Sequence, residues 1–232
     1  MAAYNKVRKN KKLLIFGTGF IAEEVYNYFT LDSQYKVIAF IKDKNHIKKK
    51  NFLGLKVYPL QNIEKKFSPK EYEVFIAIGY TDLNFLREKK FKEFKKKGFK
   101  LASYISSQAA VINPQKDYEN CLILENTTIQ TTSKIGKNVF IWANNLIGHH
   151  AKIGNNCYIS GHCTIAGSTV VGKNCFLGAN STIAHNLRIG SECIIGANSL
   201  IVSNVFNRSI SSVPQSKILK TKNLELLKKL IK

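Results

Sequence analysis

A repeat of period six runs through the middle of this chain and limits its fold more than any other feature of the sequence. Every sixth residue is aliphatic, and we call these positions the repeat marks; the residue two positions before each mark is usually small. One large and one small inward residue in every six describe a short strand followed by a corner. Three such units close a triangular coil, so the sequence predicts a prism of coils stacked about 4.8 Å apart. The repeat marks are 14 consecutive aliphatic positions: Ile123, Ile129, Ile135, Ile141, Ile147, Ile153, Ile159, Ile165, Val171, Leu177, Ile183, Ile189, Ile195 and Ile201.

The cysteines fit the same repeat, because all five occupy one phase of it. That phase is the small inward position, where Thr, Ser and Ala also occur. Since a buried free Cys behaves as a small hydrophobe, the pattern predicts packing residues rather than disulfides or a thiolate metal site. The five are Cys121, Cys157, Cys163, Cys175 and Cys193.

The first hundred residues follow a different pattern, in which apolar strands alternate with amphipathic helices. This alternation predicts a small parallel sheet with crossover helices, a Rossmann-like α/β domain. We expect strands at 11–17, 35–43, 71–79 and 99–105, and helices at 19–29 and 81–98.

The turn after the first strand has the sequence G-x-G-x-x-A, from Gly17 through Thr18, Gly19 and Phe20 to Ala22. Glycines at this turn let the backbone approach a phosphate, and the following helix N-terminus supplies N–H donors. In its strand–turn–helix context the motif favours nucleotide binding over a purely structural tight turn. A full dinucleotide site is not expected, because about 100 residues are fewer than a Rossmann domain usually needs.

The chain has a formal net charge of +21, carried by 32 Lys and only 4 Arg. Arg is preferred where an interface recognises phosphates or guanine through paired hydrogen bonds. The Lys excess favours solvated surface charge first, then attraction of anionic substrates or an anionic membrane, and no motif supports nucleic-acid binding. No apolar run suits a signal peptide or a membrane span, so we expect a cytoplasmic protein without stable membrane insertion.

These two halves together resemble one family, the bacterial nucleotide-sugar acyltransferases of the sialic-acid O-acetyltransferase and aminosugar N-acetyltransferase type. The likeness extends from LLIFGTGFIAEEV through IAIGYTDLNFLRE and the hexapeptide repeat to VPQSKILK. It implies a left-handed parallel β-helix, a homotrimer, and acetyl-CoA bound between subunits. It also implies three segments: a nucleotide-sugar-binding domain at 1–106, an acyltransferase β-helix at 107–206, and a tail with a short basic helix at 207–232.

The resemblance also implies roles for single residues. The family's catalytic histidine matches His149, and its oxyanion donor, a backbone N–H, matches Gly167. The acidic residue that commonly follows the histidine is replaced by His150, so Glu125 is the candidate to polarise His149. The implied nucleotide-sugar residues are Gly17, Thr18, Gly19, Phe20, Asp43, Asn84 and Arg87. The implied coenzyme residues are Gly167, His185, Pro214 and Lys217.

The spacing of the repeat independently predicts that Gly167 lies next to His149. Positions 18 apart fall in one column of the prism, so Thr131, His149, Gly167 and His185 stack. Gly167 therefore lies one coil from His149, roughly 5 Å along the axis. A missing side chain there leaves room for a thioester beside a base and exposes a backbone N–H to it, as acyl transfer requires.

The remaining histidines are expected at turns. His162 shares a column with Asn126, Asn144, Asn180 and Asn198, and His150 shares its phase with Asn156, Asn174 and Asn186. Asn at a repeated position indicates a corner with left-handed backbone, so we interpret both as turn residues. His46 stands in a Lys-rich loop and is expected to be exposed.

A metal site is the alternative for the histidines, since γ-class carbonic anhydrases share this β-helix and bind zinc through three of them. His149 and His185 have a spacing that this class uses, but Gly190 stands where the third ligand is expected. We therefore expect no metal.

The preferred hypothesis is acetyl transfer from coenzyme A to an amino group of a nucleotide-linked sugar, with His149 as general base. Acetylation of a sugar hydroxyl in surface-glycan synthesis is the second hypothesis. A trimeric nucleotide-sugar-binding protein without turnover is the third.

Overall fold

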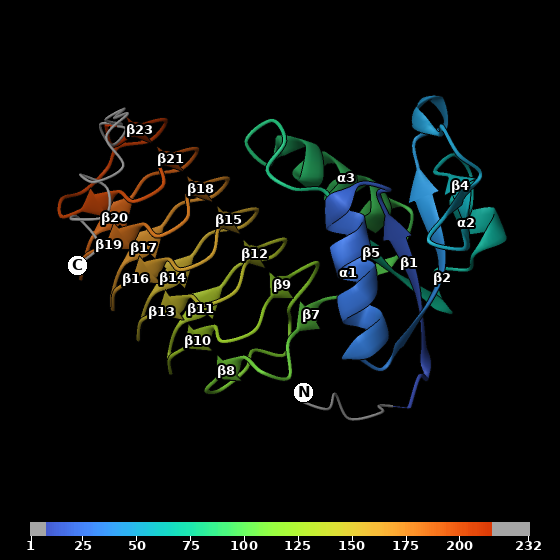
Figure 1. The fold of residues 1–232 in the computed structure, drawn as a ribbon, viewed down its shortest axis with the longest axis horizontal. Helices are drawn as coiled ribbons and strands as arrows, with labels where there is room; N and C mark the ends of the chain where they lie inside the picture. Colours follow the sequence, from blue (N-terminus) through green and yellow to red (C-terminus); the bar gives the residue numbers. More distant parts are fainter. Residues whose placement is uncertain (1–7, 215–232) are drawn as a thin grey trace, which may run out of the picture.

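The structure is a computed structural model that describes residues 8–214 (Figure 1). An N-terminal α/β domain lies beside a C-terminal triangular prism. The N-terminal sheet has the order β3-β4-β2-β1-β5-β6 and is parallel except for the β3–β4 pair. Its elements are β1 (Lys11–Phe16), α1 (Phe20–Leu31), β2 (Tyr35–Lys42), the 3-10 turn η1 (Lys44–His46), β3 (Asn51–Phe52), β4 (Leu55–Pro59), α2 (Ile63–Lys66), β5 (Tyr72–Ile76), α3 (Phe85–Lys96) and β6 (Lys100–Leu101).

The central strand β1 forms because four consecutive apolar residues, 13–16, are buried on both faces of the sheet, as is typical of parallel strands. Leu13 and Ile15 face a cluster that includes α1, whereas Leu14 and Phe16 face the cluster under α2 and α3. The helices thus cover opposite faces of the sheet. The expected parallel sheet with crossover helices is confirmed, and the β3–β4 hairpin and α2 are additions that the sequence pattern did not indicate.

The prism is a left-handed parallel β-helix whose strands are two residues long, as the period of six predicted. We number its faces 1, 2 and 3. Face 1 consists of β7 (Tyr104–Ile105), β9 (Leu122–Ile123), β12 (Phe140–Ile141), β15 (Tyr158–Ile159), β18 (Phe176–Leu177), β21 (Ile194–Ile195) and β23 (Ile210–Ser211). Face 2 consists of β8 (Ala110–Val111), β10 (Thr128–Ile129), β13 (Leu146–Ile147), β16 (Thr164–Ile165), β19 (Thr182–Ile183) and β22 (Leu200–Ile201). Face 3 consists of β11 (Lys134–Ile135), β14 (Lys152–Ile153), β17 (Val170–Val171) and β20 (Arg188–Ile189).

The register of the prism confirms the predicted coil of three hexapeptide units. Ile129 pairs with Ile147, and Ile147 pairs with Ile165, so each partner lies one full coil further along the chain. The aliphatic residues of the repeat fill the interior together with the five cysteines, all of which are buried free thiols. The expected packing role of the cysteines is therefore confirmed.

Every corner of the prism contains one residue in the left-handed region, at six-residue intervals from Asn120 to Asn198. His150 (φ 59°) and His162 (φ 61°) are two of them, so their interpretation as corner residues is confirmed. Asn dominates the series because its short amide tolerates this conformation better than most side chains.

The domain boundaries differ from the predicted ones by a few residues. The expected strand at 99–105 is divided, because β6 joins the N-terminal sheet whereas β7 pairs with β9 of the prism. The prism also continues past residue 206, since β23 pairs with β21. The basic helix expected in the tail lies largely outside the described residues.

The N-terminal domain packs on face 1 of the prism. Leu122, Phe140 and Tyr158 point outward from this face and join the cluster of Phe40 and Phe75 from the N-terminal sheet. The rings of Phe75 and Phe140 stack with their centroids 5.6 Å apart. One continuous apolar cluster therefore joins the two domains.

A ladder of buried Asn side chains runs along the edge between faces 3 and 1. Each amide donates to the carbonyl oxygen of the next, from Asn120 to Asn138 at 2.7 Å, to Asn156 at 2.8 Å and to Asn174 at 3.2 Å. The ladder begins at β5, where Ile76 N–H donates to the Asn120 amide oxygen at 2.7 Å. It ends at Glu88 of α3, which accepts from Asn174 at 3.0 Å.

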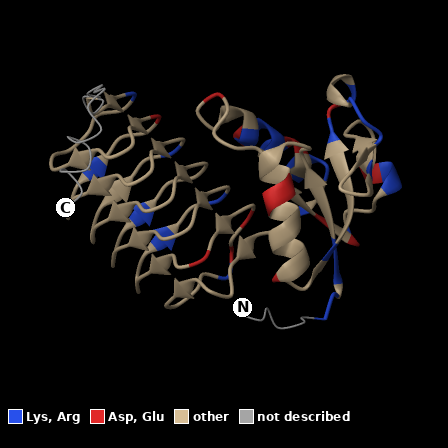
Figure 2. Cartoon of the chain, in the orientation of Figure 1, with Lys and Arg blue, Asp and Glu red and all other residues tan. Residues whose placement is uncertain are grey.

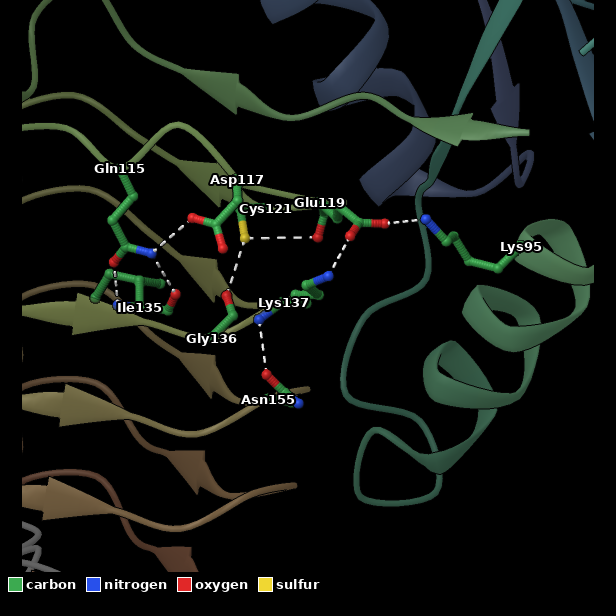
Figure 3. A network of polar contacts seen from close by, with 9 residues as sticks. All are labelled: Lys95, Gln115, Asp117, Glu119, Cys121, Ile135, Gly136, Lys137 and Asn155. Carbon is green, nitrogen blue, oxygen red and sulfur yellow. Dashed lines mark hydrogen bonds and ion pairs between the residues drawn. The ribbon is translucent and has the colours of Figure 1, made fainter. Parts of the chain in front are cut away.

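An ionic contact at the same edge adds to the domain interface (Figure 3). Glu119 accepts from Lys95 of α3 at 2.5 Å and from Lys137 of the next coil. Burial alone would raise the pKa of Glu119, but its hydrogen bonds to the two lysines lower the pKa overall. Gln115 and Asn155 cap neighbouring backbone N–H groups of Ile135 and Lys137 in the same region.

Most of the basic side chains lie in the N-terminal domain, and the prism carries few (Figure 2). Among the described residues, no helix is long and apolar enough to cross a membrane.

Candidate functional site: a nucleotide cleft and a histidine corner

A cleft of about 370 Å³ opens at the carboxyl ends of β1, β2 and β5. This is the place where open parallel sheets usually bind ligands. Its lining includes the predicted residues Gly17, Thr18, Gly19, Phe20 and Asp43. The structure therefore brings these five residues together as the sequence predicted.

The first glycine of the motif is required by close packing. Gly17 has a φ of +129°, and a Cβ at this position would lie 2.8 Å from the Ala77 carbonyl oxygen. Gly19 is the N-cap of α1, has open space around its Cα, and provides no side-chain cap. The N-terminus of α1 therefore faces the cleft with backbone donors suited to a phosphate.

Three charged residues that line the cleft are linked to the motif or to one another. Lys42 donates to the Thr18 hydroxyl at 2.9 Å, and Lys90 donates to Asp43 at 2.6 Å and to Glu93 at 3.0 Å. Burial alone would lower the pKa of Lys90, but its two carboxylate partners raise the pKa overall. Lys42 adds positive charge beside the helix N-terminus, whereas the charge of Lys90 is balanced by its two carboxylate partners.

Sequence reasoning missed several residues that line the cleft, namely Lys42, His46, Thr81 and Lys90. Lys42 ends β2 directly before Asp43, so its position beside the predicted acid was the available signal. Lys90 lies on α3, far from the motif in sequence, and only the fold brings it near. A second pocket of about 250 Å³ adjoins Thr18 and Lys42 and includes Lys48 and Lys49.

Asn84 and Arg87, which were expected to contact the nucleotide, do not line the cleft. Both side chains are fully buried between the domains. The Arg87 guanidinium donates to the carbonyl oxygens of Gly79, Asn156 and Cys157 at 2.6, 3.0 and 3.1 Å. Burial lowers the pKa of Arg87 to about 10, so the side chain is still a cation at neutral pH. These residues join α3 to the prism.

His149 lies at an exposed corner on the edge between faces 2 and 3 of the prism, between β13 and β14. Its ring covers Gly167 of the next coil, as the column prediction required. A Cβ at Gly167 would lie 2.7 Å from both Cε1 and Nε2 of His149. Within the described residues, no acceptor is assigned to the Gly167 backbone N–H. The edge of an exposed imidazole therefore lies directly over a buried glycine whose backbone donor is unassigned.

The nearest polar neighbour of the His149 ring is His150, whose Nδ1 lies 3.0 Å from Nδ1 of His149. Within one chain Glu125 does not contact the His149 ring, so its expected polarising role stays a prediction. Glu125 lies on the edge between faces 1 and 2 and accepts from the Tyr28 hydroxyl of α1 at 3.0 Å. Along the chain, Glu125 precedes His149 by one full coil and one further corner, so the two residues stand on different edges of the prism.

The expected coenzyme residues are only partly described. His185 lies in the same column as His149, with ring centroids 6.1 Å apart. Pro214 is exposed at the end of the described chain, and Lys217 lies outside the described residues. Among the described residues, no cluster of three or more His, Cys, Asp or Glu is arranged to hold a metal ion.

A groove of about 450 Å³ runs between the N-terminal domain and the edge between faces 1 and 2. Its lining is rich in aromatic rings, and the Tyr80 ring lies 5.1 Å from that of Tyr158. Ile21 belongs both to this groove and to the nucleotide cleft, so the two are adjacent. The lining is Ile21, Tyr80, Trp142, Ala143, Asn144, Tyr158, Ser160, Gly161 and His162.

The cleft and the histidine corner of one chain lie on opposite sides of the prism. The N-terminal domain covers face 1, whereas His149 lies on the one edge that does not border face 1 (Figure 1).

Both halves of the chain match known domain families. Residues 12–94 match the PglD N-terminal domain, and residues 117–226 match the GMPPB C-terminal domain. The two matches cover, one each, the two regions that the sequence assigned to separate domains.

Solved structures have the same two-domain fold over most of the chain. The acetyltransferase domain of PglB from Neisseria gonorrhoeae FA1090 is 21% identical, with a TM-score of 0.78 over 87% of this chain and 96% of that one. PerB from Caulobacter crescentus, in complex with CoA and GDP-perosamine, is 23% identical, with a TM-score of 0.76 over 86% and 92%. WeeI from Acinetobacter baumannii AYE is 20% identical, with a TM-score of 0.73 over 87% and 96%. Among curated protein sequences no significant match was found.

Proposed function

We propose that this protein transfers an acetyl group from acetyl-CoA to an amino group of a nucleotide-linked sugar. One observation carries the proposal: the Nε2 edge of His149 lies over Gly167, whose backbone N–H has no acceptor within the described residues. A base next to an oxyanion donor is what acyl transfer needs. Similarity to structures described as perosamine N-acetyltransferase supports an amine acceptor.

In the proposed reaction, the amine nitrogen of the sugar bonds to the thioester carbon, and Nε2 of His149 takes the proton that this amine loses. The Gly167 N–H donates to the oxygen of the tetrahedral intermediate, on which negative charge develops. The C–S bond then breaks, and coenzyme A leaves as a thiol after receiving a proton from His149. His185 lies further along the same column, where it can contact the coenzyme.

The nucleotide part of the acceptor fits the cleft at the motif. The N-terminus of α1 and the Lys42 ammonium face the space beside Thr18, and both favour a diphosphate. Asp43 retains acceptor capacity beside its contact with Lys90 and can receive a ribose hydroxyl. The sugar would then extend over Ile21 into the aromatic groove, since aromatic rings pack well against the apolar faces of sugars.

The placement of His149 opposite the cleft of its own chain supports a site completed by a second subunit. A homotrimer, in which the edge between faces 2 and 3 of one copy meets the groove of the next, would bring His149 to the sugar. This assembly explains why the cleft and the base are both present but separated in one chain.

The proposal is tested by thiol release from acetyl-CoA with a panel of nucleotide-linked 3-amino and 4-amino sugars and their hydroxyl counterparts. We expect release with an amino sugar, and a 10²- to 10⁴-fold loss, roughly, in His149→Ala. The exposed corner variant Asn198→Ala is the control, with unchanged activity. Release only with hydroxyl sugars would identify an O-acetyltransferase. No release with any sugar, together with thermal stabilisation by nucleotide, would identify a binding protein.

The shared site is tested by complementation. A Phe at Gly19 would fill the cleft without a clash inside the chain, because a Cβ there meets open space. Gly19→Phe and His149→Ala should each be inactive alone. Co-expression of the two should restore part of the activity, because mixed assemblies combine one intact cleft with one intact base. Failure to restore it would place the complete site within one chain.

A further inference from the structure

The contact between His149 and His150 requires one proton between two imidazoles. Their Nδ1 atoms lie 3.0 Å apart and the rings are nearly perpendicular, at 86°. A hydrogen bond at this distance exists only if one Nδ1 carries a proton and the other does not. Each histidine therefore fixes the tautomer of its neighbour.

Both histidines are attached to the preceding coil by their backbones. The His149 N–H donates to the Gln130 amide oxygen at 2.8 Å, and the His150 N–H donates to the Thr132 hydroxyl at 3.1 Å. His150 has a φ of 59°, a conformation that Asn adopts at most equivalent corners of the prism. The backbone therefore does not demand an imidazole at this corner, and the ring needs another explanation.

The far edge of the His149 ring determines which tautomer is useful. Cε1 and Nε2 lie over Gly167, which is the spot where the proposed acyl transfer takes place. A base at this spot needs an unprotonated Nε2, and a neutral imidazole with a free Nε2 has its proton on Nδ1. The proton between the two rings therefore belongs to His149, and Nδ1 of His150 is the acceptor.

We propose that His150 is a positioning residue that holds His149 in the tautomer protonated at Nδ1, with Nε2 free to act as base. This inference rests on the proposed function. When Nε2 takes the amine proton, the resulting imidazolium keeps its Nδ1–H donated to Nδ1 of His150. A neutral acceptor supports this cation by a hydrogen bond rather than by opposite charge, and it supports it only while His150 is unprotonated.

The test uses His150→Gly, which removes the acceptor and suits the left-handed backbone of this corner without strain. The first readout is the tautomer of His149, from ¹⁵N NMR of histidine-labelled full-length protein without substrates, assigned with His149→Asn. We expect Nδ1–H in the wild type and a shift toward Nε2–H in His150→Gly. The second readout is kcat, expected to fall roughly tenfold to hundredfold with little change in KM, by analogy with the partners that orient metal-bound histidines.

Two further variants separate positioning from folding. His150→Asn keeps the corner conformation and supplies an amide oxygen as acceptor, so it should restore the Nδ1–H tautomer and most of kcat. Asn198→Gly makes the same corner substitution at φ 59° on a different edge and should leave both readouts unchanged.

The outcomes separate this inference from the proposed function. An unchanged His149 tautomer in His150→Gly, or Nε2–H in the wild type, would overturn the positioning role whatever the activity. The expected tautomers in a protein that acetylates no amino sugar would leave the pair established and refute the proposed reaction.

Discussion

Two edges of the prism share the same repeat of left-handed corner residues, but one edge is buried and the other is exposed. On the edge between faces 3 and 1, the corner residues Asn138 and Asn156 are buried under α3 and hydrogen-bonded in a ladder. On the edge between faces 2 and 3, His149 and His150 are exposed. The backbone conformation is the same at both edges, so the role of a corner residue depends on whether the N-terminal domain covers it. A covered corner joins domains, and an open corner is available for chemistry.

The largest effect of breaking the covered edge is expected from Arg87→Met. The guanidinium donates to five carbonyl oxygens, two in its own domain and three in the prism. Removal of these donors leaves buried acceptors unpaired, so we expect a loss of about 3–5 kcal/mol in the free energy of unfolding. Urea denaturation measures it. A loss below about 1 kcal/mol would contradict the interface role.

The comparison between edges is sharpest in a matched pair of Asn substitutions. Asn138→Ala and Asn198→Ala place Ala in the same left-handed conformation, at φ 60° and 59°. The backbone strain cancels between them. Asn198→Ala removes an exposed acceptor of the Asn180 amide, which water can replace, whereas Asn138→Ala leaves the buried amides of Asn120 and Asn156 without one partner each. We expect Asn138→Ala to be less stable than Asn198→Ala by about 1–3 kcal/mol. Equal denaturation midpoints would refute the ladder's contribution.

The open edge should respond in activity and hardly in stability. Gly167→Ala places a methyl group 2.7 Å from Nε2 of His149, and the exposed ring can rotate away. We expect kcat to fall by about tenfold or more, since the base moves off the reacting atoms. The melting temperature should stay close to that of the wild type. An Ala184→Gly variant, which changes a methyl group one position before His185, should keep wild-type kcat.

The smallest expected effect concerns the ionic contact of Glu119 with Lys95 and Lys137. Because the folded-state pKa of Glu119 is lowered, its stabilisation is present above the unfolded-state pKa and is lost as pH falls through the folded one. Glu119→Gln should therefore lose about 0.5–1 kcal/mol at pH 7 and almost nothing at pH 2. Denaturation at both pH values checks the sign. A larger loss of stability at pH 2 than at pH 7 would exclude a stabilising contact between ionised Glu119 and the two lysines.

The sequence predicted the prism well because its period is local. The aliphatic position, the small position and the left-handed corner all recur every six residues, so coil length, register and the stacking of His149 over Gly167 follow from counting. The α/β alternation and the glycine motif likewise predicted the cleft residues from Gly17 to Asp43. Backbone geometry at a tight turn leaves a clear mark in the sequence.

The sequence did not reveal the contacts between the halves. Asn84 and Arg87 follow a strand of the N-terminal domain, and no local pattern reveals that the prism covers them. Glu125 has the same corner phase as His149, but it lies on a different edge, against Tyr28. The meeting of His150 with His149 depends on side-chain orientation at one corner, which a repeat of backbone positions does not specify.

Because the coils up to β22 have the same number of residues, the length of the prism is set by the number of coils. Because each coil contacts chiefly its two neighbours, removal of one whole coil beyond Asn174 would shorten the prism and leave every other residue on its own edge. Removal of a single hexapeptide would turn all later residues by one face and carry their side chains away from their columns. Evolution or design can therefore change the length of such a molecule only by whole coils. In the part of the prism that α3 contacts, removal of even a whole coil would break the contacts between the domains.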